Sequence, residues 1–391
     1  MNNIKKLKVN GQSIWLDSIS KQMIETGDLK KIIDQGITGI TSNPSIFEKA
    51  ISSTNSYDSL IEKVSQETKD LKIIFEKIAS EDIKTAADLL SEVYQKSKKN
   101  DGYVSLEVDP SLANDYEKTV EEAIKLWKLV DKPNLMIKIP GTNEGIKATK
   151  DLLEMGININ VTLLFSFESY KKTLDTFIES KKSNKDSRSV ASFFISRIDT
   201  AADNLLTSDA NCYHKIATSN AYNAYKYFIE QKSLMSDNFQ KLLWASTSVK
   251  SKDLSPEYYC INLPMLDTVN TLPPETINHL LTSKNLDINN SLNIKEEFGK
   301  NLLESKQYFN LNDLTDDLLI NGIKLFQESY ISVLEKIEDG EIDQHEGSFM
   351  IGKLLKELYI DSALKQSEAL EKRNAKMDQQ KAAEIIQPKH K

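Results

Sequence analysis

Short β-rich runs recur along this chain with longer helical stretches between them, and this alternation restricts the fold more than any other feature of the sequence. Parallel strands joined by helices account for such a pattern better than a sheet of hairpins does. Eight runs can be counted, at Ser13–Asp17, Ile37–Thr41, Tyr103–Glu107, Asn134–Lys138, Ile157–Thr162, Ser189–Phe193, Lys241–Ser246 and Asp267–Thr271. Eight strand-and-helix units predict an α/β fold, a (β/α)8 TIM barrel with additional C-terminal helices.

The helical stretches lie between these runs and beyond the last one. Their predicted ranges are Ser59–Ala79, Ile83–Lys98, Leu112–Leu129, Ala148–Glu154, Pro274–Phe309 and Leu311–Glu338. Apolar residues near helical spacing predict that the last stretch is a docking helix and not part of a cofactor site. Those residues are Leu311, Leu314, Leu318, Leu325, Tyr330, Leu334 and Ile337.

Two regions are expected along the chain. Residues 1–345 are predicted to form the barrel with its docking C-terminal helix, and residues 346–391 a charged helical tail. From Asp361 onward the sequence is a charged helix former with Ala and Gln and little apolar face, so a frayed tail is expected there.

Composition narrows the function classes. The 391 residues carry 50 basic and 58 acidic side chains, a net charge of −8, which argues against broad nucleic-acid binding because that needs a basic face. No apolar run approaches the ~18 residues of a membrane span. Two cysteines cannot build a disulfide framework, and the lysine-rich N-terminus lacks the apolar stretch of a signal peptide, so a cytoplasmic protein is expected.

No cofactor or metal is expected either. The four histidines lie far apart without metal-ligand spacing, and the 13 glycines form neither a dinucleotide nor a nucleotide cradle. Any anionic ligand of so acidic a protein must therefore meet a local cationic site.

Polar side chains follow the predicted strands at the ends where the loops of a barrel converge on one mouth. They are Asp17, Asn43, Glu107, Lys138, Thr162, Ser192, Arg197 and Ser246. Each has an ordinary structural alternative. Asp17 could cap a helix beginning near Ser18, Asn43 could serve an Asn-Pro turn, and Glu107 could flank the turn at 109–111. Their joint placement on separate strand ends is what indicates an active site.

Strand alternation directs two of these side chains inward. Because Val104, Leu106 and Val108 share one face of their run, Ser105 and Glu107 share the other. Lys138 likewise lies between Ile137 and Ile139. Burial disfavours a charged amine, and a neutral lysine amine is the nucleophile of Schiff-base chemistry. The alternatives are an edge-strand lysine reaching solvent or a structural ion pair with Glu107.

Arginine usage gives an independent indication. The chain has only Arg188, Arg197 and Arg373, and Arg197 lies at the mouth side of the sixth strand. A guanidinium is the preferred clamp for phosphate, and Lys250 could supply a second positive charge. The alternative is that Arg197 pairs with Asp199 or a helix carboxylate.

These motifs resemble the transaldolase family, in the longer form found in many bacteria, over about Val9 to Glu338. The stretches that carry the resemblance are Gly36–Ala50, Val104–Pro110, Asn134–Thr142, Gly156–Phe165, Val190–Asp199 and Thr268–Pro273. The resemblance implies a (β/α)8 barrel that needs no cofactor. It also implies transfer of a dihydroxyacetone unit from a ketose phosphate, sedoheptulose 7-phosphate or fructose 6-phosphate, to an aldose phosphate, glyceraldehyde 3-phosphate or erythrose 4-phosphate, in the non-oxidative pentose phosphate pathway.

The resemblance also implies roles for single residues. Lys138 matches the Schiff-base lysine, Asp17 the acid/base for carbon–carbon cleavage, and Asn43 the ligand of the donor's hydroxyl groups. Glu107 and Thr162 match the pair that handles water during imine formation. Ser192 and Arg197 match the phosphate site, with Phe194 as a neighbouring wall, whereas the stretch around Lys250 departs from the family pattern.

Two other functions stay open from sequence. A related Schiff-base aldolase would release the three-carbon unit to solvent, and an inactive barrel would serve as a binding scaffold. The expected partners are small-molecule sugar phosphates, with neither nucleic acid nor membrane, and a homodimer is the assembly considered.

Overall fold

A closed barrel of eight parallel strands forms the centre of the protein, so the predicted fold class is confirmed. A computed structural model describes residues 2–184, 186–235, 237–283, 286 and 295–339. The strands follow one another around the barrel in chain order, and β8 pairs with β1 to close it. Their bounds are β1 Gln12–Leu16, β2 Gly39–Ile40, β3 Val104–Glu107, β4 Leu135–Pro140, β5 Ile159–Leu164, β6 Ser189–Phe194, β7 Lys241–Ala245 and β8 Thr268–Leu272.

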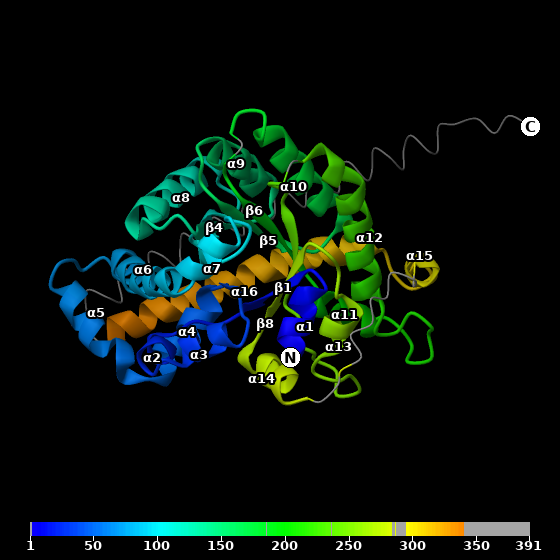
Figure 1. Cartoon of the computed structure of the whole chain (residues 1–391), viewed down its shortest axis with the longest axis horizontal. Coiled ribbons are helices and arrows are strands. Elements are labelled where there is room, and N and C mark those ends of the chain that lie inside the picture. The colour runs from blue at the N-terminus through cyan, green and yellow to red at the C-terminus, as the bar shows by residue number, and fades with distance from the viewer. Residues whose placement is uncertain (1, 185, 236, 284–285, 287–294, 340–391) are drawn as a thin grey trace, which may run out of the picture. The chain divides into compact units, whose positions relative to one another are not determined.

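Helices surround the strands (Figure 1). Their bounds are α1 Asn3–Val9, α2 Lys21–Glu25, α3 Asp28–Asp34, α4 Pro44–Ser53, α5 Asp58–Ser65, α6 Leu71–Leu89, α7 Ser91–Lys96, α8 Tyr116–Val130, α9 Asn143–Glu154, α10 Phe167–Ser180, α11 Ser196–Asp203, α12 Ile216–Gln231, α13 Tyr258–Asn262, α14 Pro274–Thr282, α15 Lys295–Ser305 and α16 Leu311–Asp339. Three short 3-10 helices complete the set within the described ranges, at Asn55–Tyr57, Pro110–Leu112 and Lys232–Leu234.

The strands are buried on both faces because helices cover the outside and side chains fill the inside. On β1, period two directs Ser13 and Trp15 to the same side as Asp17. The hydroxyl of Ser13 and the indole N–H of Trp15 both donate to Asp101, at 2.6 and 2.9 Å. Gly39 on β2 leaves room for Trp15, since a Cβ there would lie 2.4 Å from the indole ring. The barrel is therefore packed below its mouth.

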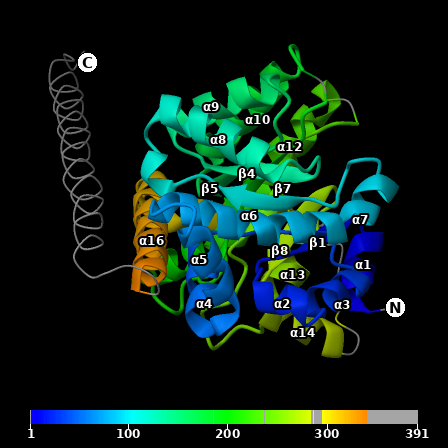
Figure 2. The same cartoon turned by 90° about the vertical axis from the view of Figure 1, so that its left-hand side faces the viewer.

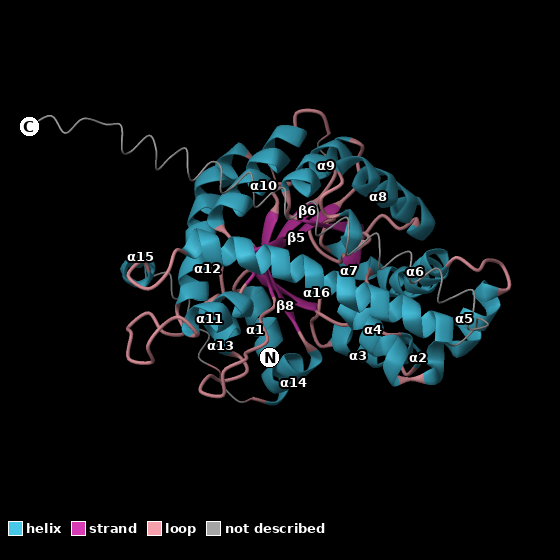
Figure 3. Ribbon diagram, turned by 180° about the vertical axis from the view of Figure 1, so that it is seen from behind, coloured by secondary structure: helices cyan, strands magenta, loops and turns pink. Residues whose placement is uncertain are grey.

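The long helix α16 crosses the barrel strands (Figure 3), whereas α1 lies on the opposite side of them (Figure 2). Contacts with α4, α6 and the 3-10 turn after β3 hold α16 in place. Ser329 Oγ lies 2.7 Å from Ser45 Oγ, and Tyr330 meets Phe75 edge to face at 5.3 Å between ring centroids. The predicted docking helix is thus present, but Leu325 is 49 % exposed and Phe326 only 3 %. The expectation for Leu325 was wrong because Phe326 takes the buried position at this turn of the helix, whereas Leu314, Tyr330, Leu334 and Ile337 are buried as predicted.

The helix predicted at Ser59–Ala79 is two helices. Asp70 accepts hydrogen bonds from the backbone N–H groups of Lys72 and Ile73 and so begins α6, which then runs through the break predicted after Ala79. The first compact unit spans Met1–Ile337. The boundary expected at 345/346 and the frayed tail lie outside the described residues. Among those residues, no helix has the length and apolar character needed to cross a membrane, and no group of three or more metal-ligating side chains is found.

Candidate active site

A cavity of about 170 Å³ opens where the strands end and α16 crosses them. Side chains from separate strand ends and from α16 surround it. Its lining consists of Asp17, Thr41, Asn43, Ser45, Lys138, Thr162, Ser192, Phe194, Arg197, Ala245, Ser246, Thr247, Ser248, Lys250, Thr271, Pro273 and Phe326. Nine of the ten site residues expected from sequence therefore line one cavity, and the tenth, Glu107, contacts Lys138 directly.

Lys138 and Glu107 form an ion pair inside the barrel. Nζ of Lys138 lies 3.0 Å from Oε2 of Glu107 and donates to the carbonyl oxygen of Ser42 at 3.1 Å. Both side chains are almost fully buried. Strand β4 is hydrogen-bonded to β3 and β5, so the alternative of an edge-strand lysine is wrong. Burial raises the pKa of the Glu107 carboxyl above its usual value, although Lys138 acts in the opposite direction. This pair can exchange a proton.

Two oxygen atoms near this pair are left without partners. Oε1 of Glu107 and Oγ1 of Thr162 are both buried and have no hydrogen-bond partner among the described residues. Polar atoms orphaned in this way usually bind a water or a ligand group. The lower part of the cavity is therefore suited to a hydrogen-bonded water or a substrate hydroxyl.

Asp17 is held by Thr41, directly after β2, and does not cap a helix. Its carboxylate accepts a hydrogen bond from Thr41 Oγ1 at 2.7 Å, and Oγ1 of Thr271 lies 3.0 Å from that hydroxyl. Helix α2 begins later, with Ser20 as its N-cap. The capping interpretation of Asp17 is therefore wrong, and its carboxylate lines the cavity.

Asn43 is the N-cap of α4 and also lines the cavity. Its Oδ1 caps α4 by accepting the backbone N–H of Ile46 at 3.0 Å.

The turn expected beside Glu107 is made by Asp109, which accepts the N–H of Ser111 at 2.9 Å. The turn interpretation of Glu107 is therefore wrong.

Arg197 lies in the first turn of α11, with its guanidinium in the cavity wall. Cζ lies 5.5 Å from the ring centroid of Phe194. Burial lowers the pKa of Arg197 below its usual value, and Asp17 acts against this shift. Among the described residues, no carboxylate lies within ion-pair distance of its guanidinium. The predicted alternative partner, Asp199, accepts instead from the Ala217 N–H at 2.7 Å and the Tyr259 hydroxyl at 2.9 Å.

Ser192 and Lys250 complete the expected set. The hydroxyl of Ser192 donates to Oδ1 of Asn160 at 2.7 Å. Lys250 is exposed, and its Nζ lies 3.4 Å from Ser248 Oγ. The cationic end of the cavity thus combines a half-buried guanidinium with an exposed ammonium.

Sequence reasoning missed several residues in and around the cavity, and Asn160 and Phe326 are the two that matter most for its geometry. Asn160 is fully buried and donates to Ser105 Oγ at 3.0 Å, joining β5 to β3 and β6. Period two on β5 places it on the face of Thr162, so this signal was present. Phe326 had no local signal beyond lying in an amphipathic helix, because its contacts with the cavity are long-range.

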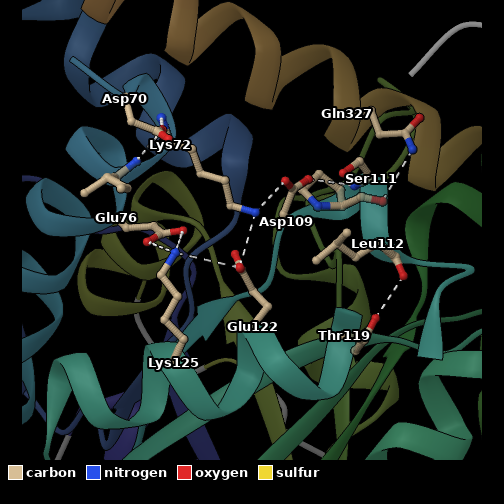
Figure 4. Close-up of polar contacts among 12 residues, drawn as sticks. Asp70, Lys72, Glu76, Asp109, Ser111, Leu112, Thr119, Glu122, Lys125 and Gln327 are labelled. Carbon is tan, nitrogen blue, oxygen red and sulfur yellow. Dashed lines mark hydrogen bonds and ion pairs between the residues drawn. The ribbon is translucent and has the colours of Figure 1, made fainter. Parts of the chain in front are cut away.

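A cluster of ion pairs anchors the turn that follows Glu107 (Figure 4). Nζ of Lys72 lies 3.0 Å from Asp109 and 3.2 Å from Glu122. From α16, Nε2 of Gln327 donates to the Pro110 carbonyl oxygen in the same turn at 3.4 Å. Burial acts to lower the pKa of Lys72, but the two carboxylates outweigh it and the pKa is raised. The end of β3 is therefore fixed from α6, α8 and α16.

Comparison with known proteins shows the family to which this chain is similar. A family model described as Transaldolase/Fructose-6-phosphate aldolase matches residues 14–337. A protein named Transaldolase from Trichodesmium erythraeum (strain IMS101) is 38 % identical over 371 residues, covering 86 % of this chain and 97 % of that one. Transaldolase 2 from Nostoc sp. (strain PCC 7120) is 37 % identical, with 86 % and 97 % covered. Transaldolase from Saccharopolyspora erythraea is 36 % identical, with 88 % and 98 % covered.

Proposed function

This chain belongs to the transaldolase/fructose-6-phosphate aldolase family and has transaldolase function, and we propose that Lys138 is its Schiff-base nucleophile. The supporting observation is the buried contact of Lys138 with Glu107, 3.0 Å apart beside the cavity. The substrates proposed are a ketose phosphate donor, sedoheptulose 7-phosphate or fructose 6-phosphate, and an aldose phosphate acceptor, glyceraldehyde 3-phosphate or erythrose 4-phosphate.

Imine formation begins with a proton transfer. The Lys138 ammonium gives a proton to Glu107, whose raised pKa favours the acid form, and the neutral amine attacks the ketone carbon. The carbinolamine hydroxyl then leaves as water after taking the proton from Glu107, through a water held at Thr162. Within the adduct one proton has moved from the nitrogen to the former ketone oxygen, so loss of one water leaves a protonated imine and the Glu107 carboxylate.

Carbon–carbon cleavage uses the second carboxylate. Asp17 removes the proton of the C4 hydroxyl, the C3–C4 bond breaks, and its electron pair moves to the imine nitrogen to give an enamine. The aldose phosphate leaves with its new carbonyl group. Addition of the enamine to an acceptor aldehyde reverses these steps, Asp17 returns the proton, and water hydrolyses the imine.

The remaining residues bind the sugar phosphate. Asn43 contacts donor hydroxyl groups through the part of its amide that does not cap α4. Arg197 clamps the phosphate, and Lys250 adds an exposed charge. The Ser192 hydroxyl turns from Asn160 Oδ1 to donate to the phosphate, and Phe194 forms the wall beside the guanidinium.

Borohydride trapping tests this proposal. Treatment in the presence of fructose 6-phosphate should reduce the imine to a stable amine, and peptide mass mapping should place the adduct on Lys138. Lys138→Met should abolish the adduct and turnover, whereas Lys147→Met, at an exposed lysine on α9, should change neither. An adduct at another lysine would refute the mechanism.

The family description also names an aldolase activity, which the same Schiff base would support. An aldolase releases the three-carbon unit to solvent, and a scaffold has no turnover. Product analysis with and without an aldose phosphate separates these functions, because release at an equal rate without acceptor contradicts group transfer.

A homodimer and a cytoplasmic location are also part of the proposal. Sedimentation velocity tests the homodimer, and cell fractionation tests the location.

A further inference from the structure

The wall above the lysine and the arginine comes from α16 and not from the barrel. The ring centroid of Phe326 lies 5.5 Å from Lys138 Nζ and 5.9 Å from Arg197 Cζ. Phe326 is 3 % exposed and lines the cavity. Phe194 of β6 lies at 5.5 Å from the same guanidinium. Arg197 therefore contacts two aromatic rings, one from the barrel and one from the crossing helix.

A glycine one turn earlier on α16 also faces Arg197. A Cβ at Gly322 would lie 3.6 Å from Nη1 of Arg197 and 3.1 Å from Cδ2 of Leu163. The 3.1 Å distance to Leu163 is tighter than an ordinary contact, whereas 3.6 Å from Nη1 is an ordinary van der Waals contact, so a side chain longer than alanine would press on Leu163 or the guanidinium. The absence of a side chain lets the helix backbone approach Arg197 closely.

The position of this helix face is fixed from elsewhere. Gln327 donates to the Pro110 carbonyl oxygen, Ser329 contacts Ser45, and Tyr330 packs on Phe75. All three contacts come from residues that follow Phe326 on α16, and none of them involves Lys138, Arg197 or Lys250. The placement of the Phe326 ring is therefore determined by the docking of α16 as a whole.

We propose that Phe326 and Gly322 are positioning residues that hold the Arg197 guanidinium ready for the phosphate of the substrate. The inference rests on the proposed phosphate role of Arg197. A long side chain without a carboxylate partner among the described residues needs another restraint, and ring faces attract a partly buried guanidinium. Binding to a pre-ordered side chain loses less conformational entropy than binding to a free one.

Steady-state kinetics of Phe326→Leu test this role on fructose 6-phosphate and fructose. We expect KM for fructose 6-phosphate and the inhibition constant of inorganic phosphate both to rise about tenfold, with kcat changing less and KM for fructose unchanged. Phe326→Tyr, which keeps a ring face, should restore the wild-type values. Gly322→Leu should raise the same two constants. An equal rise in KM for both sugars would overturn the proposal. So would a Phe326→Tyr variant whose KM for fructose 6-phosphate is as high as that of Phe326→Leu.

Two comparisons make the result specific. Tyr330→Leu removes a buried aromatic from the same helix without touching the cavity, so an equal rise in KM there would mean that helix docking alone matters. In an Arg197→Ala background, Phe326→Leu should not raise KM further, and an additive rise would refute positioning. If Arg197→Ala itself spares the phosphate preference, the phosphate clamp fails. If Arg197→Ala abolishes the preference for the phosphorylated sugar but Phe326→Leu leaves it intact, the phosphate role of Arg197 stands and this inference fails.

Discussion

Glu107 and Lys138 occupy the same level of neighbouring strands, β3 and β4, and their side chains meet with Oε2 3.0 Å from Nζ. The register of the barrel thus brings an acid and an amine together before any substrate arrives. Because the turn after Glu107 is anchored by Lys72 through Asp109, this distance depends on packing outside the cavity as well as inside it.

The two carboxylates should be separable by their steps. Asp17→Asn should still form the imine at close to the wild-type rate but lose ~10²–10⁴-fold in turnover, because cleavage lacks its base. Glu107→Gln should instead form the imine about 10²-fold more slowly. Rapid-quench borohydride trapping with fructose 6-phosphate measures both rates. Trapping at the wild-type rate in both variants would show that Glu107 has been given the wrong role.

The two cations should differ in their effect on phosphate binding. Arg197→Ala should raise KM for fructose 6-phosphate more than tenfold, since a partly desolvated guanidinium–phosphate pair contributes roughly 2 kcal/mol. Lys250→Ala should raise it less because this ammonium is an exposed point charge. Fructose is the control substrate. Equal losses on both sugars would mean that Arg197 supports the barrel instead of binding phosphate.

Stability should fall with rising pH through Asp199. Burial raises the pKa of this carboxyl from 3.8 to about 7, with the Ala217 N–H and the Tyr259 hydroxyl acting in the opposite direction. Between those values the folded chain holds a proton that the unfolded chain has released, so the free energy of unfolding falls by roughly 1.4 kcal/mol per pH unit. Asp199→Asn should remove this part of the slope in urea titrations at pH 4.5 to 7.5. Parallel slopes for variant and wild type would contradict it.

The packing of Trp15 predicts a cost at Gly39. Gly39→Ala would place a Cβ 2.4 Å from the indole and should lower the free energy of unfolding by roughly 1 to 3 kcal/mol. Gly299→Ala is the matched control, because nothing lies within 4 Å of its Cβ position on α15 and alanine favours a helix by up to about 1 kcal/mol. Urea denaturation measures both free energies of unfolding. An unchanged value for Gly39→Ala would contradict the prediction, because it would show that Trp15 can move aside in the barrel interior.

Local patterns predicted the barrel because each strand carries its own apolar alternation and each helix its own stripe. The alternation also placed Glu107 and Lys138 inward, and the structure brings them into contact. The break between α5 and α6 was misplaced because one capping residue, Asp70, outweighed a continuous apolar pattern. Phe326 could not be found locally, since nothing in a helix period tells which face will meet an arginine more than a hundred residues earlier.

The crossing of the mouth by α16 also sets an order in time. During synthesis at ~5–20 residues per second, Asp17 is made about 15 to 60 s before Phe326. The proposed acid, amine and phosphate clamp all precede the helix that walls them. A chain still on the ribosome therefore holds the proposed reacting groups while lacking the wall, and the site is complete only once α16 has been released.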